Sequence, residues 1–195
     1  LLTSVYFISF ASFQLPLGLL LDRFGPRRTE SVLLIFAALG ALIFSMAESL
    51  SGLILGRLLI GFGVSACLMA SFKAYVLWFP PDRLPLMNGL QMVAGGLGAM
   101  SATVPLRSAL EFTDWRGVFL ILSGLTLFSA LVLWLVYPEK EGSAGPVPMK
   151  KQLEGLKTVL TSRPFLAIAP LVMFSQSAQM AIQGLWAKPW LRDVA

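Results

Sequence analysis

The sequence predicts an all-α integral membrane protein, a bundle of transmembrane helices, and two observations carry this prediction. First, 56% of the 195 residues are hydrophobic and only 13% are charged, whereas a soluble domain carries about 25% charged residues. Second, the uncharged runs approach the roughly 20 residues that a helix needs to cross a bilayer. A chain with so few charges cannot cover its surface against water, so we expect the lipid bilayer to be its main partner.

Six apolar stretches follow one another along the chain. The third, residues 52–79, carries Arg57 and Lys73. The other five hold no charged residue and cover residues 1–21, 31–47, 84–106, 117–138 and 164–187. A buried helix of a soluble protein explains one such stretch but not six. A secretory signal peptide does not explain the first, since its apolar core would have about 7–15 residues behind a basic start.

Basic residues are distributed unevenly over the five connections between these stretches. The first, third and fifth connections hold nine of them: Arg23, Arg27, Arg28, Arg83, Lys140, Lys150, Lys151, Lys157 and Arg163. The second and fourth connections and the C-terminal tail hold four: Arg107, Arg116, Lys188 and Arg192. Cytoplasmic loops are the basic ones. We therefore expect the odd connections, including residues 22–30 and 139–163, on the cytoplasmic side of a plasma membrane, for a bacterium the inner membrane. This orientation accounts for the net charge of +5, so we expect no nucleic-acid partner.

The fifth connection divides the chain. Residues 139–148 are polar and flexible in composition, whereas residues 149–161 place Leu153, Leu156 and Leu160 at helical spacing. This spacing indicates a short amphipathic helix on the membrane surface, with a solvated linker as the alternative. The predicted organisation is a first helical part (residues 1–138), an inter-half loop (139–163) and the start of a second half (164–195).

The first connection carries a motif. It contains Gly18, Leu20, Asp22, Arg23, Gly25, Arg27 and Arg28 at fixed spacing. This pattern resembles the signature loop between the second and third helices of the major facilitator superfamily. The resemblance implies a transporter fold of twelve helices, of which this chain covers the second to seventh. It also implies that Gly18, Asp22, Arg23, Gly25, Arg27 and Arg28 form a conformational latch.

The chemistry of the loop can be stated separately. Gly18 allows a neighbouring helix to approach closely, and Gly25 permits a tight reversal. Asp22 ends its helix, where its carboxylate can face the positive N-terminus of another helix. The arginines keep the loop on the cytoplasmic side of the membrane and can pair with Asp22 or with lipid phosphates. The alternative is an ordinary turn with inside-facing arginines.

A second resemblance lies at Arg57, Gly61 and Gly63, which match a stretch in the fourth helix of the same superfamily. It implies that Arg57 takes part in substrate binding or proton coupling. An arginine inside a membrane costs at least a few kcal/mol and normally faces a polar interior. Snorkelling to the nearby outer face is the alternative. Lys73 is expected either to snorkel at the other end of the span or to attract an anion.

Polar residues suggest where a small-molecule substrate binds. Gln176, Gln179 and Gln183 share one face of the last apolar stretch, with Trp186 nearby. Unpaired amides facing lipid cost several kcal/mol, so a substrate cavity or helix-to-helix hydrogen bonds are expected there. Gln14 and Gln91 are further candidates. Arg57 and Lys73 in one helix favour an anionic substrate.

The sequence favours a secondary transporter that works by alternating access, with a proton as a possible coupling ion. The chain has no His and a single Cys, Cys67, so we expect neither a catalytic group, a metal, a cofactor nor an enzyme. The spans before Pro164 are expected to hold no Asp or Glu, so no proton-coupling carboxylate is predicted. The alternatives are a truncated or non-transporting relative of the superfamily and an intramembrane enzyme or receptor.

Overall fold

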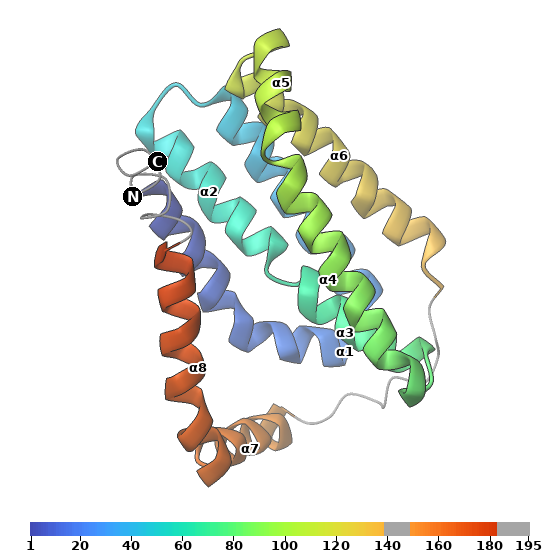
Figure 1. Cartoon of the computed structure of the whole chain (residues 1–195). Coiled ribbons are helices and arrows are strands. Elements are labelled where there is room, and N and C mark those ends of the chain that lie inside the picture. Colours follow the sequence, from blue (N-terminus) through green and yellow to red (C-terminus); the bar gives the residue numbers. More distant parts are fainter. Residues whose placement is uncertain (139–148, 183–195) are drawn as a thin grey trace. The chain divides into compact units, whose positions relative to one another are not determined.

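The computed structural model describes residues 1–138 and 149–182, and Figure 1 shows the helices within each of its two units. The part of the chain that the structure describes is helical and contains no strand, which confirms the all-α prediction. The first unit contains α1 (Leu2–Met46), α2 (Leu50–Val64), α3 (Cys67–Trp78), the 3-10 helix η1 (Pro81–Arg83), α4 (Leu84–Ser101), α5 (Val104–Phe112) and α6 (Trp115–Val136). The second unit, which begins after residue 146, contains α7 (Met149–Leu160) and α8 (Arg163–Ala181).

Helix α1 consists of two legs that meet at Gly25. This glycine has φ +76° and ψ 167°, a backbone conformation that residues with a Cβ rarely adopt. Helix therefore continues to residue 24 and resumes at Pro26, a residue type suited to the first turn of a helix. The tight reversal at Gly25 is confirmed. The expected connection over residues 22–30 contains this reversal but is tighter than expected, because helical backbone includes Asp22 on one side of the turn and Glu30 on the other.

Contacts along the helices define how they run. The Ser9 hydroxyl donates to the Leu58 carbonyl and the Gln14 amide to the Ser65 carbonyl, so the first leg of α1 is parallel to α2. The second leg is antiparallel to α2, because Gly40 contacts residue 60 and Ala37 contacts Gly63.

Helix α6 packs on the second leg of α1. The Ser123 hydroxyl donates to the Ala38 carbonyl at 2.7 Å, and the Arg116 guanidinium donates to the Ser45 carbonyl at 3.3 Å. The residue numbers fall in one helix as they rise in the other, so α6 is antiparallel to this leg. Asp114 begins α6 by accepting a hydrogen bond from the Gly117 amide at 2.8 Å, as expected of an N-cap.

Small residues allow the closest helix contacts. A Cβ added at Gly61 would lie 2.5 Å from the Tyr6 carbonyl oxygen, and one at Gly63 would overlap the backbone of Ala37. Gly61 and Gly63 therefore allow α2 to approach the α1 backbone closely. At Gly18, by contrast, an added Cβ meets nothing within 4 Å among the described residues, so the close approach expected there is not made within the described chain.

The third apolar stretch bends but stays one span. Helix α2 ends at Val64 and α3 starts at Cys67, while Ser65 and Ala66 between them keep right-handed helical angles. The Ser65 hydroxyl donates to the Phe62 carbonyl at 2.7 Å, which competes with the regular helical pattern.

The expected continuous span over residues 84–106 is wrong. Helix α4 ends at Ser101, Thr103 has non-helical angles, and α5 starts at Val104. Pro105 explains the break, because it lacks an amide hydrogen and its ring clashes with the carbonyl four residues earlier.

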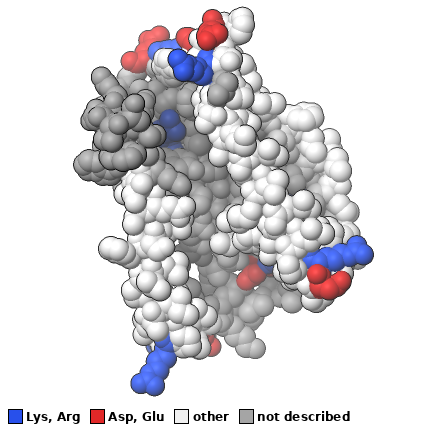
Figure 2. Space-filling view, viewed as in Figure 1, with Lys and Arg blue, Asp and Glu red and all other residues white. Residues whose placement is uncertain are grey.

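Three segments among the described residues are long and apolar enough to cross a membrane: Pro16–Met46, Leu50–Trp78 and Trp115–Val136. Helix α4 has 18 residues but is less apolar because it contains glycines, Asn88 and Gln91. Figure 2 shows that charged side chains over α4 and α5 gather at the ends of these helices, with an uncharged surface between them. This distribution suits a bundle that lies in lipid.

Candidate functional site

The turn of α1 is tied to α3 by an ion pair. The Lys73 ammonium lies 2.5 Å from the Asp22 carboxylate and also donates to the Leu21 carbonyl at 2.8 Å. Asp22 was expected to end a helix and face a helix N-terminus. Asp22 lies in the last turn of the first leg, three residues before the break at Gly25, and its carboxylate pairs with the Lys73 ammonium. The Lys73 ammonium thus uses two of its three donors on oxygens of the first leg.

The arginines of the motif contact different surfaces. The Arg27 guanidinium donates through Nε to the Trp134 carbonyl at 3.0 Å and lies 5.5 Å from the centre of the Trp134 ring. Arg23 lies 5.3 Å from the ring centre of Phe24. Arg28 lines an apolar cavity of about 330 Å³ between the two legs of α1 and α2. Arg27 thus fastens α6 to the turn, a contact that the sequence did not predict.

Glu30 is an acid that sequence reasoning placed outside the spans. It lies five residues after the break at Gly25, in the second leg of α1, and is only 9% exposed. Its Oε2 atom is buried without a hydrogen-bond partner among the described residues, and its carboxyl lies within hydrogen-bonding reach of the Cys67 thiol. The signal was present in the sequence, since Glu30, Leu33 and Ala37 share one helical face that is buried.

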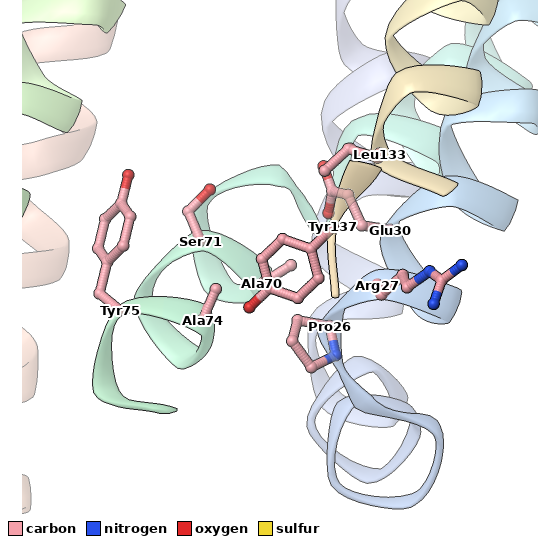
Figure 3. A pocket seen from close by; sticks show the side chains of 9 residues that line it. All are labelled: Pro26, Arg27, Glu30, Ala70, Ser71, Ala74, Tyr75, Leu133 and Tyr137. Carbon is pink, nitrogen blue, oxygen red and sulfur yellow. The ribbon is translucent and has the colours of Figure 1, made fainter. Parts of the chain in front are cut away.

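A cavity of about 220 Å³ opens beside Glu30. Its walls come from α1, α3, α6 and the residue after α6: Pro26, Arg27, Glu30, Ala70, Ser71, Ala74, Tyr75, Leu133 and Tyr137. Figure 3 shows the Glu30 carboxyl pointing toward α3, whereas the Arg27 side chain points away from α3. The cavity therefore presents an acid, not the neighbouring guanidinium, to the α3 side.

Arg57 is held by aromatic rings. Its guanidinium carbon lies 4.7 Å from the ring centre of Phe44 and 5.4 Å from that of Phe119, within the range of cation–π attraction. The side chain is half-buried, and its Nε atom is buried without a hydrogen-bond partner among the described residues. Phe44 belongs to α1 and Phe119 to α6, so the guanidinium lies where three helices meet.

The glutamine candidates fall into three groups. Gln14 donates to the Ser65 carbonyl at 3.1 Å, and Gln91 accepts from the Tyr75 hydroxyl at 2.6 Å, so both join helices. Gln176 and Gln179 are exposed on α8, which belongs to the second unit. Gln183 and Trp186 lie outside the described residues.

Comparison with known proteins agrees with this architecture. The family model of the Major Facilitator Superfamily matches residues 1–188. The chain belongs to the Major Facilitator Superfamily. It is therefore a multi-pass membrane protein of a transporter family, and the superfamily resemblance of its turn motif is confirmed.

Three curated relatives illustrate the similarity. The nitrate/nitrite transporter NrtP of Picosynechococcus is 42% identical over 83 residues, which is 43% of this chain and 15% of that protein. The uncharacterized transporter YybO of Bacillus subtilis is 32% identical over 139 residues, 71% of this chain and 32% of that protein. Monocarboxylate transporter 4 of the rat is 32% identical over 177 residues, 86% of this chain and 36% of that protein. The chain thus spans little more than a third of these relatives at most.

Proposed function

We propose that this chain is part of a secondary transporter that moves a small anion by alternating access, with the Asp22–Lys73 ion pair as its conformational latch. The single observation that carries the proposal is this pair, because it joins the signature turn of a transporter family to a neighbouring helix. The resemblance from the sequence supplies the expectation of a latch, and the pair supplies its chemistry.

The ion pair has the strength that a reversible contact requires. The Asp22 side chain is 51% exposed and that of Lys73 is 23% exposed, so water and salt screen their attraction. Pairs of this kind contribute on the order of 1 kcal/mol or less. A contact of that size biases an equilibrium between two conformations without locking it.

An anionic substrate is supported by Arg57 and by the relatives. The buried Nε of Arg57 has no hydrogen-bond partner among the described residues, and the two rings beside it hold the cation without neutralising its charge. Guanidinium donors match the planar oxygens of nitrate and carboxylate. The names of two of the relatives specify nitrate, nitrite and monocarboxylates, all of which are anions.

The orientation and mechanism follow from the same assignment. The turn at Gly25 lies on the cytoplasmic side of the plasma membrane, as the distribution of basic residues favours. The ion pair closes one side of the transport path, and its breakage accompanies the change of access. Gln14 and Gln91 position helices around the path, while Gln176, Gln179, Gln183 and Trp186 contribute from the other half.

The test is anion uptake by the full-length protein in liposomes, with nitrate and lactate as probes. We expect uptake by the natural protein, and loss of most uptake in the Asp22→Asn variant with normal membrane insertion. Asp82→Asn is the matched control, because Asp82 is an exposed acid in η1. Normal uptake by Asp22→Asn would contradict the latch, and uptake of neither probe by the natural protein would contradict the anion assignment.

A further inference from the structure

Glu30 is a buried acid that neither the latch nor the anion site uses. One of its carboxyl oxygens lacks a partner among the described residues, and the side chain faces a thiol instead of a base. An ionised carboxylate in such surroundings is strongly disfavoured unless it gains a partner. It can gain one in two ways, by binding a proton or by contact with water or a cation.

The groups around Glu30 are committed elsewhere. From α3, Lys73 pairs with Asp22, and the Tyr75 hydroxyl donates to Gln91. From α1, the Arg27 guanidinium donates to the Trp134 carbonyl.

Two further groups border the same space. Tyr137 follows α6, and burial raises the pKa of its phenol above the ordinary value, so this group stays neutral near pH 7. The Cys67 thiol is intrinsically a weaker acid than a carboxyl group. Among these neighbours, Glu30 is the group suited to exchange a proton.

The cavity beside Glu30 provides a path for that proton. Its volume of about 220 Å³ exceeds the roughly 30 Å³ that one water molecule occupies in the liquid. Its walls include α1 and α3, the two helices that the Asp22–Lys73 pair joins. A movement that breaks this pair also separates the walls and hydrates the carboxyl.

We propose that Glu30 is a proton-binding site and that its protonation is linked to opening of the latch. In the closed state the carboxylate binds one proton from water and becomes a neutral acid. When α1 and α3 separate, more water surrounds the carboxyl and stabilises the carboxylate, so the proton is released to water. Any factor that favours the open state then favours proton release by the same amount, because such coupling is reciprocal. The link to transport rests on the proposed function, whereas the proton site does not.

The proton site is tested by infrared difference spectroscopy of the full-length protein between about pH 5 and about pH 8. A protonated carboxyl gives a carbonyl stretching band that a carboxylate lacks. We expect such a band in the natural protein and its loss in Glu30→Gln, while Glu30→Asp retains a shifted band. Glu48→Gln is the matched control, because Glu48 is an exposed acid between α1 and α2. An unchanged band in Glu30→Gln would overturn the proposal.

The link to the latch is tested by nitrate uptake over the same pH range. Glutamine mimics the protonated acid. At every pH, Glu30→Gln should therefore show the uptake rate that the natural protein shows at the lowest pH of the range. We expect the natural rate to change by about tenfold over this range and the variant rate by less than about twofold. Equal pH dependence in both proteins would overturn the link. Absence of uptake by the natural protein would sink the proposed function but leave the infrared result to decide on the proton site.

Discussion

Helices α2 and α3 form one bent span, but they are attached to α1 in different ways. Helix α2 is attached by close packing, with Gly56, Gly61 and Gly63 against the α1 backbone. Helix α3 has no glycine. It packs on α1 through Ala70 in the apolar core and adds polar side-chain contacts, the Lys73–Asp22 pair and the contact of Cys67 with Glu30. Close packing has few alternative arrangements, whereas polar contacts can exchange partners with water. We therefore expect α2 to be the more rigid part of this span and α3 to be the part that moves.

The largest expected effect breaks the packing of α2. A Cβ at Gly63 would overlap the Ala37 amide and the Leu33 carbonyl, both of which are backbone atoms and cannot rotate away. We expect Gly63→Val to lower the stability of the full-length protein in detergent by about 3 kcal/mol, measured as a lower midpoint of thermal unfolding. Gly124→Val is the control, since a Cβ there meets nothing within 4 Å among the residues that the structure describes. Equal losses in both variants would show that α2 is not specially rigid.

The next effect concerns the cation held by α2. We expect Arg57→Gln to reduce nitrate uptake by about ten- to a hundredfold, since a hydrogen bond to a charged group contributes about 1.5–3 kcal/mol. Arg57→Lys keeps the charge but loses the planar donors, so its nitrate uptake should lie between that of the natural protein and that of Arg57→Gln. Initial rates over a range of nitrate concentrations measure this effect. If the variant loses uptake only in proportion to its loss of folded protein, and the dependence of its rate on nitrate concentration is unchanged, a binding role for Arg57 is contradicted.

A smaller effect is expected at the polar attachment of α3. Lys73→Asp should impair uptake several-fold, because it leaves two carboxylates facing each other. Combining it with Asp22→Lys should recover part of the loss, up to the pair's contribution of about 1 kcal/mol. Thermal unfolding of the same proteins should change little. If the double exchange is no better than the single one, the attachment of α3 does not depend on this pair.

The smallest effect is expected where α3 meets α4. Tyr75→Phe removes the hydroxyl that donates to Gln91 at 2.6 Å and should cost about 1 kcal/mol. Gln91→Leu should cost a similar amount, and the double variant should cost little more than either single one. Unfolding midpoints of the three proteins provide this double-mutant cycle. Strictly additive losses would show that the hydrogen bond contributes nothing in the native protein.

Much of this fold could be predicted because its signals are local. Composition and the apolar runs were enough to indicate a membrane helix bundle. The reversal at Gly25 was predictable because only glycine readily takes φ +76°. The amphipathic spacing of residues 149–161 predicted α7, which the structure confirms as a helix. The break before Pro105 was also readable from the residue type, although the continuous apolar run concealed it.

The site was less predictable because its contacts join residues that are far apart in sequence. Asp22 and Lys73 are separated by 51 positions and Arg27 and Trp134 by 107, and no local pattern specifies such partners. Arg57 was predicted to be important, but its place between Phe44 and Phe119 depends on how three helices pack.

The sequence by itself determined that the chain lies in a membrane, where it turns and which family its turn motif resembles, because hydropathy and backbone conformation depend on neighbouring residues. Only the tertiary structure decided that Lys73 forms an ion pair with Asp22, that Gly18 packs on no described residue and that Glu30 is buried. Burial and pairing depend on which helix faces arrive opposite each other, and that is a property of the assembled bundle.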